Sequence, residues 1–176
     1  MLRRTLLATA SVVALSLAGI GQAAWAGASE ADVKTSIAEF ERASPAIESI
    51  IKNAHGYAVF PTVGKGAIGI GGAHGDGLVY EKGKLIGATT LSQITIGFQL
   101  GGQAYRELIC FQNKEALDKF KGGNFEFDAQ VSAVAVTAGI SRDAAYEHGV
   151  AIYTMAKGGL MYEASVGGQK FSFEPK

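Results

Sequence analysis

The chain is poor in cysteine and proline, and both shortages restrict what it can be. Cys110 is the only cysteine among 176 residues, so no internal disulfide can form and a disulfide-stabilised scaffold is excluded. Because Cys110 lies in an apolar stretch, Leu108–Phe111, we predict a buried, unreactive thiol. Only three prolines accompany 24 glycines, and no low-complexity run is present, which indicates a folded domain with tight turns and crowded strands.

An excess of charge and the usual catalytic motifs are also missing. Sixteen basic residues balance sixteen acidic ones, so the sequence lacks the basic surface expected of a nucleic-acid-binding protein. His55, His74 and His148 have spacings that fit no metal motif, although His74 and Asp76 are close enough in sequence to be considered as ligands. No H-E-x-x-H, G-x-S-x-G or cysteine–histidine pair occurs. We therefore predict no catalytic residues, no metal and no cofactor, and a protein that is not an enzyme.

The first 26 residues have the pattern of a secretory signal peptide. Arg3 and Arg4 precede an apolar run from Leu6 to Ile20, and Ala24-Trp25-Ala26 forms an A-x-A cleavage site. The apolar run is short for a membrane span, so a membrane anchor is the weaker alternative. We predict cleavage after Ala26, one domain from residue 27 to residue 176, and a periplasmic or secreted location.

Two helices are predicted at the start of this domain, over residues 30–43 and 45–54. Apolar residues recur with helical spacing from Ser29 to Asn53. Ser29 followed by Asp32 predicts a capping box, and Ser44-Pro45 predicts a second helix start. A further short helix is predicted over residues 114–120.

Most of the remaining chain shows the alternation typical of strands. Leu78–Glu81 and Leu85–Ala88 flank Lys82-Gly83-Lys84, which predicts a hairpin. From Ser92 to Gln103 the sequence predicts a half-buried strand, whose apolar face carries Ile94, Ile96, Phe98 and Leu100. Residues 125–138 are predicted to form one long strand or a bulged pair of strands, and further strands are predicted over residues 150–155, 160–166 and 170–173. The predicted fold class is α+β: a glycine-rich, mainly antiparallel twisted sheet or partly closed barrel, covered by the N-terminal helices.

The most unusual stretch is Gly64–Gly77, in which half of the residues are glycine. It contains a G-x-G-x-x-G, but no helix can follow across the remaining glycines, which disfavours a dinucleotide-binding loop. Asp76-Gly77 predicts a turn. We interpret the stretch as a glycine-rich strand with Ile68 and Ile70 on one face. Its glycines would let a backbone or a ligand approach closely, and this role is predicted for Gly69, Gly71, Gly72, Gly75 and Gly77.

Three segments taken together resemble the SYLF domain family. They are Gly56-Tyr57-Ala58-Val59-Phe60-Pro61, the glycine-rich run from Gly69 to Gly77, and the run from Ser92 to Gln103, and they occur in the family's order. The resemblance extends from about Ser29 to the end of the chain. It implies a lipid-binding domain, because eukaryotic members bind phosphoinositides and some fungal members bind actin. Actin binding is not expected of an exported protein.

The resemblance implies contact with a phospholipid or a membrane surface. The basic N-terminal segment of the eukaryotic members corresponds here to Lys34, Arg42 and Lys52, which five acidic residues outnumber; this argues against tight binding of polyphosphorylated headgroups. A headgroup is instead predicted at the glycine-rich turn, with charge from Lys65, His74, Lys82 and Lys84. Two alternatives stay open: a periplasmic structural or protein-interaction module without a lipid ligand, and a small outer-membrane β-barrel.

Overall fold

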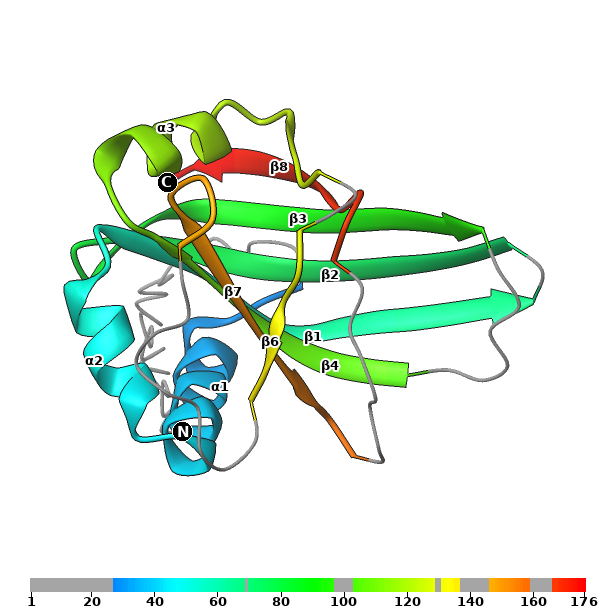
Figure 1. Cartoon of the computed structure of the whole chain (residues 1–176), viewed down its shortest axis with the longest axis horizontal. Helices are drawn as coiled ribbons and strands as arrows, with labels where there is room; N and C mark the ends of the chain where they lie inside the picture. The colour runs from blue at the N-terminus through cyan, green and yellow to red at the C-terminus, as the bar shows by residue number, and fades with distance from the viewer. Residues whose placement is uncertain (1–26, 69, 97–102, 129–130, 137–145, 159–165) are drawn as a thin grey trace, which may run out of the picture.

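A computed structural model describes residues 27–68, 70–96, 103–128, 131–136, 146–158 and 166–176 (Figure 1). The predicted signal peptide therefore lies outside the described residues. The described part contains three helices and eight strands. They are α1 (Glu30–Ala43), α2 (Ala46–Asn53), β1 (Gly56–Ile68), β2 (Ile70–Glu81), β3 (Lys84–Ile96), β4 (Gln103–Phe111), α3 (Lys114–Lys121), β5 (Phe125–Glu126), β6 (Val134–Ala135), β7 (Val150–Ala156) and β8 (Lys170–Pro175).

The three predicted helices are confirmed. At the start of α1 the Ser29 hydroxyl accepts the Asp32 backbone N–H at 3.1 Å, and the Asp32 carboxylate accepts the Ser29 backbone N–H, which completes the capping box. Ser44 does not cap α2 with its side chain, because Pro45 occupies the N-cap position. Asn113 caps α3 through a hydrogen bond of 2.9 Å from the Ala116 backbone N–H.

All eight strands form one sheet in the order β5-β8-β3-β2-β1-β4-β7-β6, antiparallel except for the β6–β7 pair. This order separates β8 from β4 by three strands. Yet Gln169, next to β8, donates hydrogen bonds to Tyr105 and Glu107 on β4 at 3.1 and 3.0 Å. The sheet therefore curls into a half-barrel that brings these strands together inside the curl. The predicted α+β class with a mainly antiparallel, partly closed sheet is confirmed.

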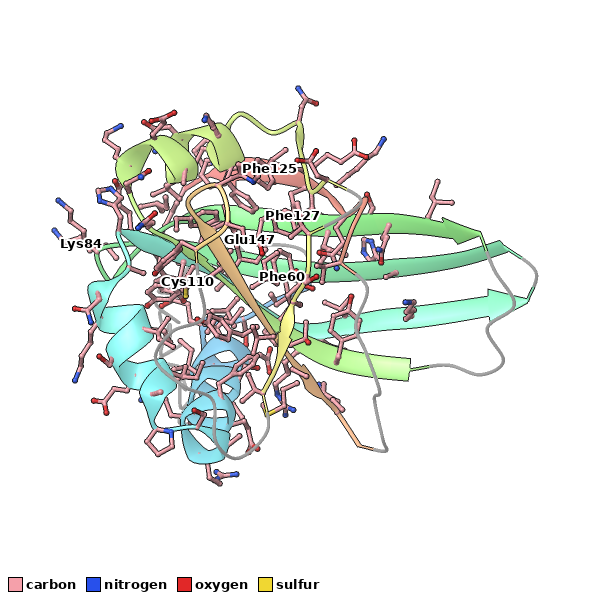
Figure 2. All side chains as sticks on the ribbon, in the orientation of Figure 1. Phe60, Lys84, Cys110, Phe125, Phe127 and Glu147 are labelled. Atoms are coloured by element: carbon pink, nitrogen blue, oxygen red, sulfur yellow. The ribbon has the colours of Figure 1, made fainter. Side chains whose placement is uncertain are left out.

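The inside of the curl holds the larger hydrophobic core, which we call the inner core. Phenylalanines from β1, β4, β8 and α3 meet there, with ring centroids 4.9 to 5.8 Å apart for Phe60–Phe171, Phe111–Phe120 and Phe120–Phe171. Phe60, Phe125 and Phe127 point into this region in Figure 2. Burial of this apolar surface closes the half-barrel around α3.

The outer face of the sheet is covered by α1 and α2 at one end only. Val33, Phe40 and Ile47 from the helices pack on Leu78, Leu108 and other sheet residues, with Cys110 fully buried among them. The predicted burial of this thiol is confirmed, and the burial raises the pKa of Cys110 to about 12. In Figure 1 the long strands β1, β2 and β3 continue past these helices toward the right of the view. None of the helices in the described part of the chain is both long enough and apolar enough to cross a membrane.

The glycine-rich stretch is a hairpin and not a single strand. Its residues divide between the end of β1 and the start of β2, and Ile68 pairs with Ile70 across the hairpin. Asp76 and Gly77 lie within β2, so the turn predicted there is wrong, whereas the hairpin at Lys82-Gly83 is confirmed. The prediction failed because the turn preference of Asp-Gly is local, whereas the long pairing of β1 with β2 keeps Asp76 and Gly77 in an extended strand.

Two other strand predictions differ from the structure. Between residues 125 and 138 only Phe125–Glu126 and Val134–Ala135 are strands in the described part. On β3, Ile94 is 81% exposed while Gln93 is buried, so Ile94 faces outward and not into the core. The inner position suits Gln93 because its side-chain amide donates to the Gly167 carbonyl at 2.8 Å. Phe98, Leu100 and the strand predicted over residues 160–166 lie largely outside the described residues, whereas β7 and β8 confirm the other two predictions.

Candidate functional site

The structure does not bring the four predicted headgroup residues together. Lys65 pairs with Ala73, which belongs to the inner core, whereas His74 pairs with Gly64 and Ser92 on the outer face. Lys65 and His74 therefore project from opposite faces of the sheet. Lys82 and Lys84 flank the hairpin at the far end of β2, about 25 Å from His74 at the rise of an extended strand.

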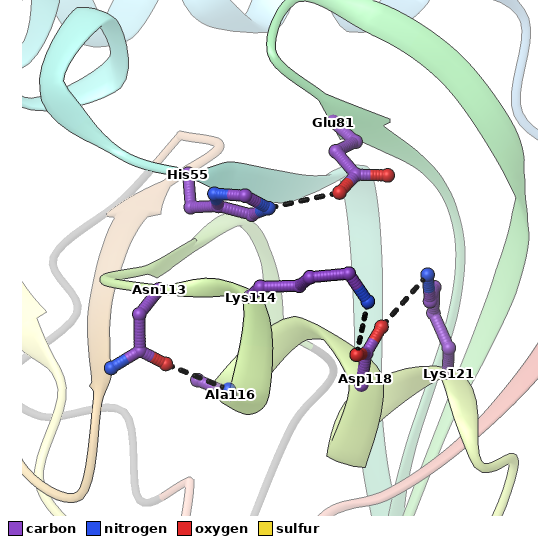
Figure 3. A network of polar contacts seen from close by, with 7 residues as sticks. All are labelled: His55, Glu81, Asn113, Lys114, Ala116, Asp118 and Lys121. Atoms are coloured by element: carbon purple, nitrogen blue, oxygen red, sulfur yellow. Dashed lines mark hydrogen bonds and ion pairs between the residues drawn. The ribbon is translucent and has the colours of Figure 1, made fainter.

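Charged groups near this far hairpin already have partners in the protein (Figure 3). His55 Nε2 lies 2.9 Å from Glu81 Oε1, and this hydrogen bond is the main cause that lowers the pKa of Glu81. On α3, Asp118 pairs with Lys114 and with Lys121 at 2.5 and 3.0 Å. Lys84 points away from the domain in Figure 2. At this end of the molecule, His55 thus joins the segment before β1 to the end of β2, and the ion pairs of Asp118 lie within α3.

His74 instead borders a polar hollow of about 380 Å³ on the outer face. One wall is the N-terminal part of α1, which contributes Asp32. The floor is formed by β1 and β2, with Thr62, His74 and Asp76. Pro61 lies at a β-bulge where the register of β1 shifts against both neighbouring strands. The bulge accommodates a residue without an N–H in a central strand, and it turns Thr62 and Gly64 toward the hollow.

Two basic side chains reach this hollow from the far wall. Arg106 is on β4, and Lys157 follows β7, where its backbone N–H donates to the Ala104 carbonyl at 2.9 Å. The Lys157 ammonium donates a short hydrogen bond to the Thr62 hydroxyl. Arg106 Nε is buried and has no hydrogen-bond partner among the described residues. A buried donor without a partner carries a desolvation cost that an acceptor from a ligand would remove.

Two carboxylates face these bases. The Ser29 hydroxyl donates to Asp32 at 2.6 Å; this bond is the main cause that lowers the pKa of Asp32, and Lys157 adds to it across the hollow. Asp76 lies next to Gly27, whose φ is +100° and where a Cβ would be 1.9 Å from Asp76 Oδ2. Only glycine fits at residue 27, so the chain segment that leads into α1 closes this side of the hollow.

The glycines of β2 fall into groups with different surroundings. A Cβ at Gly75 would lie 2.9 Å from the Thr62 carbonyl oxygen, and one at Gly77 would lie 2.8 Å from the Phe60 ring, so both allow β1 to pack closely. A Cβ at Gly72 would lie 3.2 Å from the Gln93 carbonyl oxygen. Gly71 is a buried residue of β2, and Gly69 lies outside the described residues.

The hollow is not arranged as a metal centre. His74 Nε2 and Asp76 Oδ1 are 3.9 Å apart, and no cluster of three or more potential metal ligands occurs in the described ranges. What the hollow offers is hydrogen-bond donors and charges of both signs around a shallow, open space.

Sequence reasoning found His74 but missed Arg106 and Lys157. Arg106 is on β4, 29 residues beyond Gly77, and Lys157 follows β7, 80 residues beyond Gly77; each is an isolated base in its own segment. Strand alternation gives a signal for Arg106 alone: it places Arg106 on the face of β4 opposite to the face that carries the buried Glu107.

The fold and the hollow define a class: an α+β half-barrel whose candidate site is a polar surface hollow. Comparison with known proteins then gives a family. Residues 92–176 match the family model described as "Las17-binding protein actin regulator", which is the SYLF domain family. Over these residues the match confirms the resemblance found in the sequence.

One curated relative also matches. "Beta cell expansion factor A" of Aeromonas veronii is 28% identical over 129 residues, which cover 72% of this chain and 49% of the relative. The matched region thus spans about half the length of that protein.

Proposed function

We propose that the protein is an exported, non-catalytic domain that associates with phospholipids through the hollow beside α1. One observation carries the proposal: Arg106, Lys157 and His74 converge there, and the buried Arg106 Nε has no hydrogen-bond partner in the described part of the chain. A phosphate group supplies the acceptors that such donors need, and an arginine fork suits it well. The family resemblance and the predicted signal peptide support a role at a bacterial membrane surface.

The charges of the hollow favour one kind of headgroup. Arg106 and Lys157 face Asp32 and Asp76, so the fixed charges cancel when His74 is neutral. The negative charges of a polyphosphorylated headgroup would be repelled by the carboxylates of Asp32 and Asp76. A zwitterionic headgroup with one phosphate and one ammonium matches both signs. We therefore propose an aminophospholipid such as phosphatidylethanolamine as the preferred lipid.

Co-sedimentation of the purified protein with vesicles tests this proposal. We expect the double variant Arg106→Gln/Lys157→Gln to bind phosphatidylethanolamine-containing vesicles roughly tenfold or more weakly, because each charge-assisted hydrogen bond contributes about 1.5–3 kcal/mol. Lys119→Gln on α3 is the matched control; it also removes a positive charge, but from an exposed ion pair with Glu115.

Three results would count against the proposal. Equal binding by the double variant and the wild type would exclude the hollow. Stronger binding to phosphoinositide vesicles would exclude the zwitterionic preference. No binding to any vesicle would favour the alternative of a periplasmic protein-interaction module, a role of the same general kind as the protein binding named in the family's description.

A further inference from the structure

Two glycines on the outer face of β1 are required neither by their backbone angles nor by contacts with the described residues. The backbones of Gly64 and Gly66 avoid the left-handed region that favours glycine. A Cβ at Gly64 would have its nearest contact at 4.0 Å, and one at Gly66 would meet nothing within 4 Å among the described residues. Glycine in a strand costs up to about 1 kcal/mol relative to a β-forming residue. These two positions thus carry a stability cost that no packing among the described residues explains.

The inward-facing glycines of β2, in contrast, are required by close packing. At Gly75 and Gly77 a Cβ would approach β1 to 2.9 Å or less, so internal packing explains them. Gly64 and Gly66 belong to β1 and face away from the inner core, and no described side chain lies within 4 Å of a Cβ built at either position. Close approach of a partner outside the protein would account for these two positions, which contacts among the described residues do not explain.

One large apolar side chain projects from this bare surface. Ile94 on β3 pairs with Gly72, which in turn pairs with Gly66, so its cross-strand neighbours along this row have no side chains. Ile94 is 81% exposed and is the most exposed large hydrophobic side chain among the described residues. Flanked by glycines, it extends beyond the surface around it.

This bare surface is continuous with the hollow. Gly64 lines the hollow and pairs with His74, which also lines it, and His74 pairs with Ser92, two residues from Ile94. We propose that this bare end of the sheet, defined by Gly64, Gly66, Gly72 and Ile94, is a membrane-docking surface. It lies close against a phospholipid bilayer with Ile94 inserted among the acyl chains.

The occupant we assign is a bilayer because the surface has three properties that suit one. Its glycines allow lipid headgroups to approach the sheet backbone, and the protruding side chain of Ile94 matches the hydrocarbon beneath them. The adjoining hollow offers charges of both signs to the headgroup of a neighbouring lipid. The inference rests on the proposed function, since it places the hollow at the level of the headgroups.

The first experiment measures the depth of residue 94. In Ile94→Cys an environment-sensitive dye can be attached at residue 94 alone, because Cys110 is fully buried and its thiol pKa is raised to about 12. With phosphatidylethanolamine vesicles we expect the emission to shift to the blue and to be quenched by lipids brominated on their acyl chains. The same dye on Lys84→Cys, at the opposite end of the sheet, should stay in water.

The second experiment separates the fold from the surface. Gly66→Thr should keep or raise the melting temperature but weaken vesicle binding, because the new side chain fills open space and holds the bilayer away. Ile94→Ser should reduce vesicle partitioning roughly tenfold to hundredfold, as expected for one buried isoleucine. Ala135→Thr, which places a threonine on the exposed edge strand β6, is the control for Gly66→Thr.

The outcomes distinguish this inference from the proposed function. If Arg106→Gln/Lys157→Gln impairs vesicle binding while Gly66→Thr and Ile94→Ser do not, the docking surface is overturned and the headgroup site stands. If the emission of a dye at residue 94 changes with protein concentration in the absence of vesicles, the surface binds a second copy of the chain and the inference is also overturned. If the wild type binds no vesicle, both proposals fail together.

Discussion

Replacing Glu107 by glutamine is expected to remove most of the pH dependence of the protein's stability between pH 5 and pH 9. Glu107 is completely buried in the inner core of the half-barrel. Its carboxyl group receives one hydrogen bond, from Gln169 Nε2 at 3.0 Å, and its other oxygen has no partner among the described residues. Burial raises the pKa of Glu107 from its ordinary 4.5 to about 8, and the hydrogen bond from Gln169 offsets this rise only in part.

The sign of the effect follows from this direction. A carboxyl whose pKa is raised by folding binds its proton more tightly in the native state, so the unfolded state holds fewer protons over this range. The stabilising contribution is therefore fully present below pH 4.5 and is lost as the pH rises to about 8. At 1.36 kcal/mol per pKa unit, the wild type should lose about 4 kcal/mol of unfolding free energy between pH 5 and pH 9.

Urea denaturation followed by circular dichroism at several pH values measures this loss. In Glu107→Gln the corresponding change should fall to a small fraction of the wild-type value, because an amide does not titrate. Glu126→Gln on the exposed strand β5 is the matched control and should retain the wild-type pH dependence. If the wild type and Glu107→Gln lose stability in parallel, Glu107 is not neutral in the folded protein at pH 7.

Local signals in the sequence were sufficient for the helices and for one hairpin. Capping residues and helical spacing act within a few residues, so Ser29 and Asp32 fix the start of α1 wherever it packs. Lys82 and Gly83 both take the positive φ angles of a tight hairpin turn, which identifies that reversal locally as well.

Features that depend on the sheet as a whole could not be read from the chain. Alternation shows that Gln93 and Ile94 face opposite sides of β3, but not which side is inside the curl. That choice is made by distant segments, since Gln93 is buried through its bond to Gly167. The hollow could not be predicted for the same reason. Its basic residues lie on β4 and after β7, and only the sheet order brings them close to His74 on β2.

The stability of the half-barrel should depend strongly on Phe171. This residue of β8 is buried, and its ring centroid lies 5.0 to 6.1 Å from those of four other phenylalanines, Phe60, Phe120, Phe125 and Phe127. These rings come from β1, α3, β5 and the segment after it, so Phe171 joins four parts of the inner core. Truncation of such a residue leaves a cavity as well as losing buried apolar area.

Phe171→Ala should therefore lower the unfolding free energy by about 3–5 kcal/mol in urea denaturation. Phe173→Ala is the matched control, because Phe173 lies two residues along the same strand and packs against the inner core while only partly buried. We expect it to cost clearly less, which would show that closure of the curl, and not the pairing of β8 with β3, accounts for the larger loss. Equal losses in the two variants would mean that β8 contributes through its strand pairing alone and that the aromatic cluster does not hold the half-barrel closed.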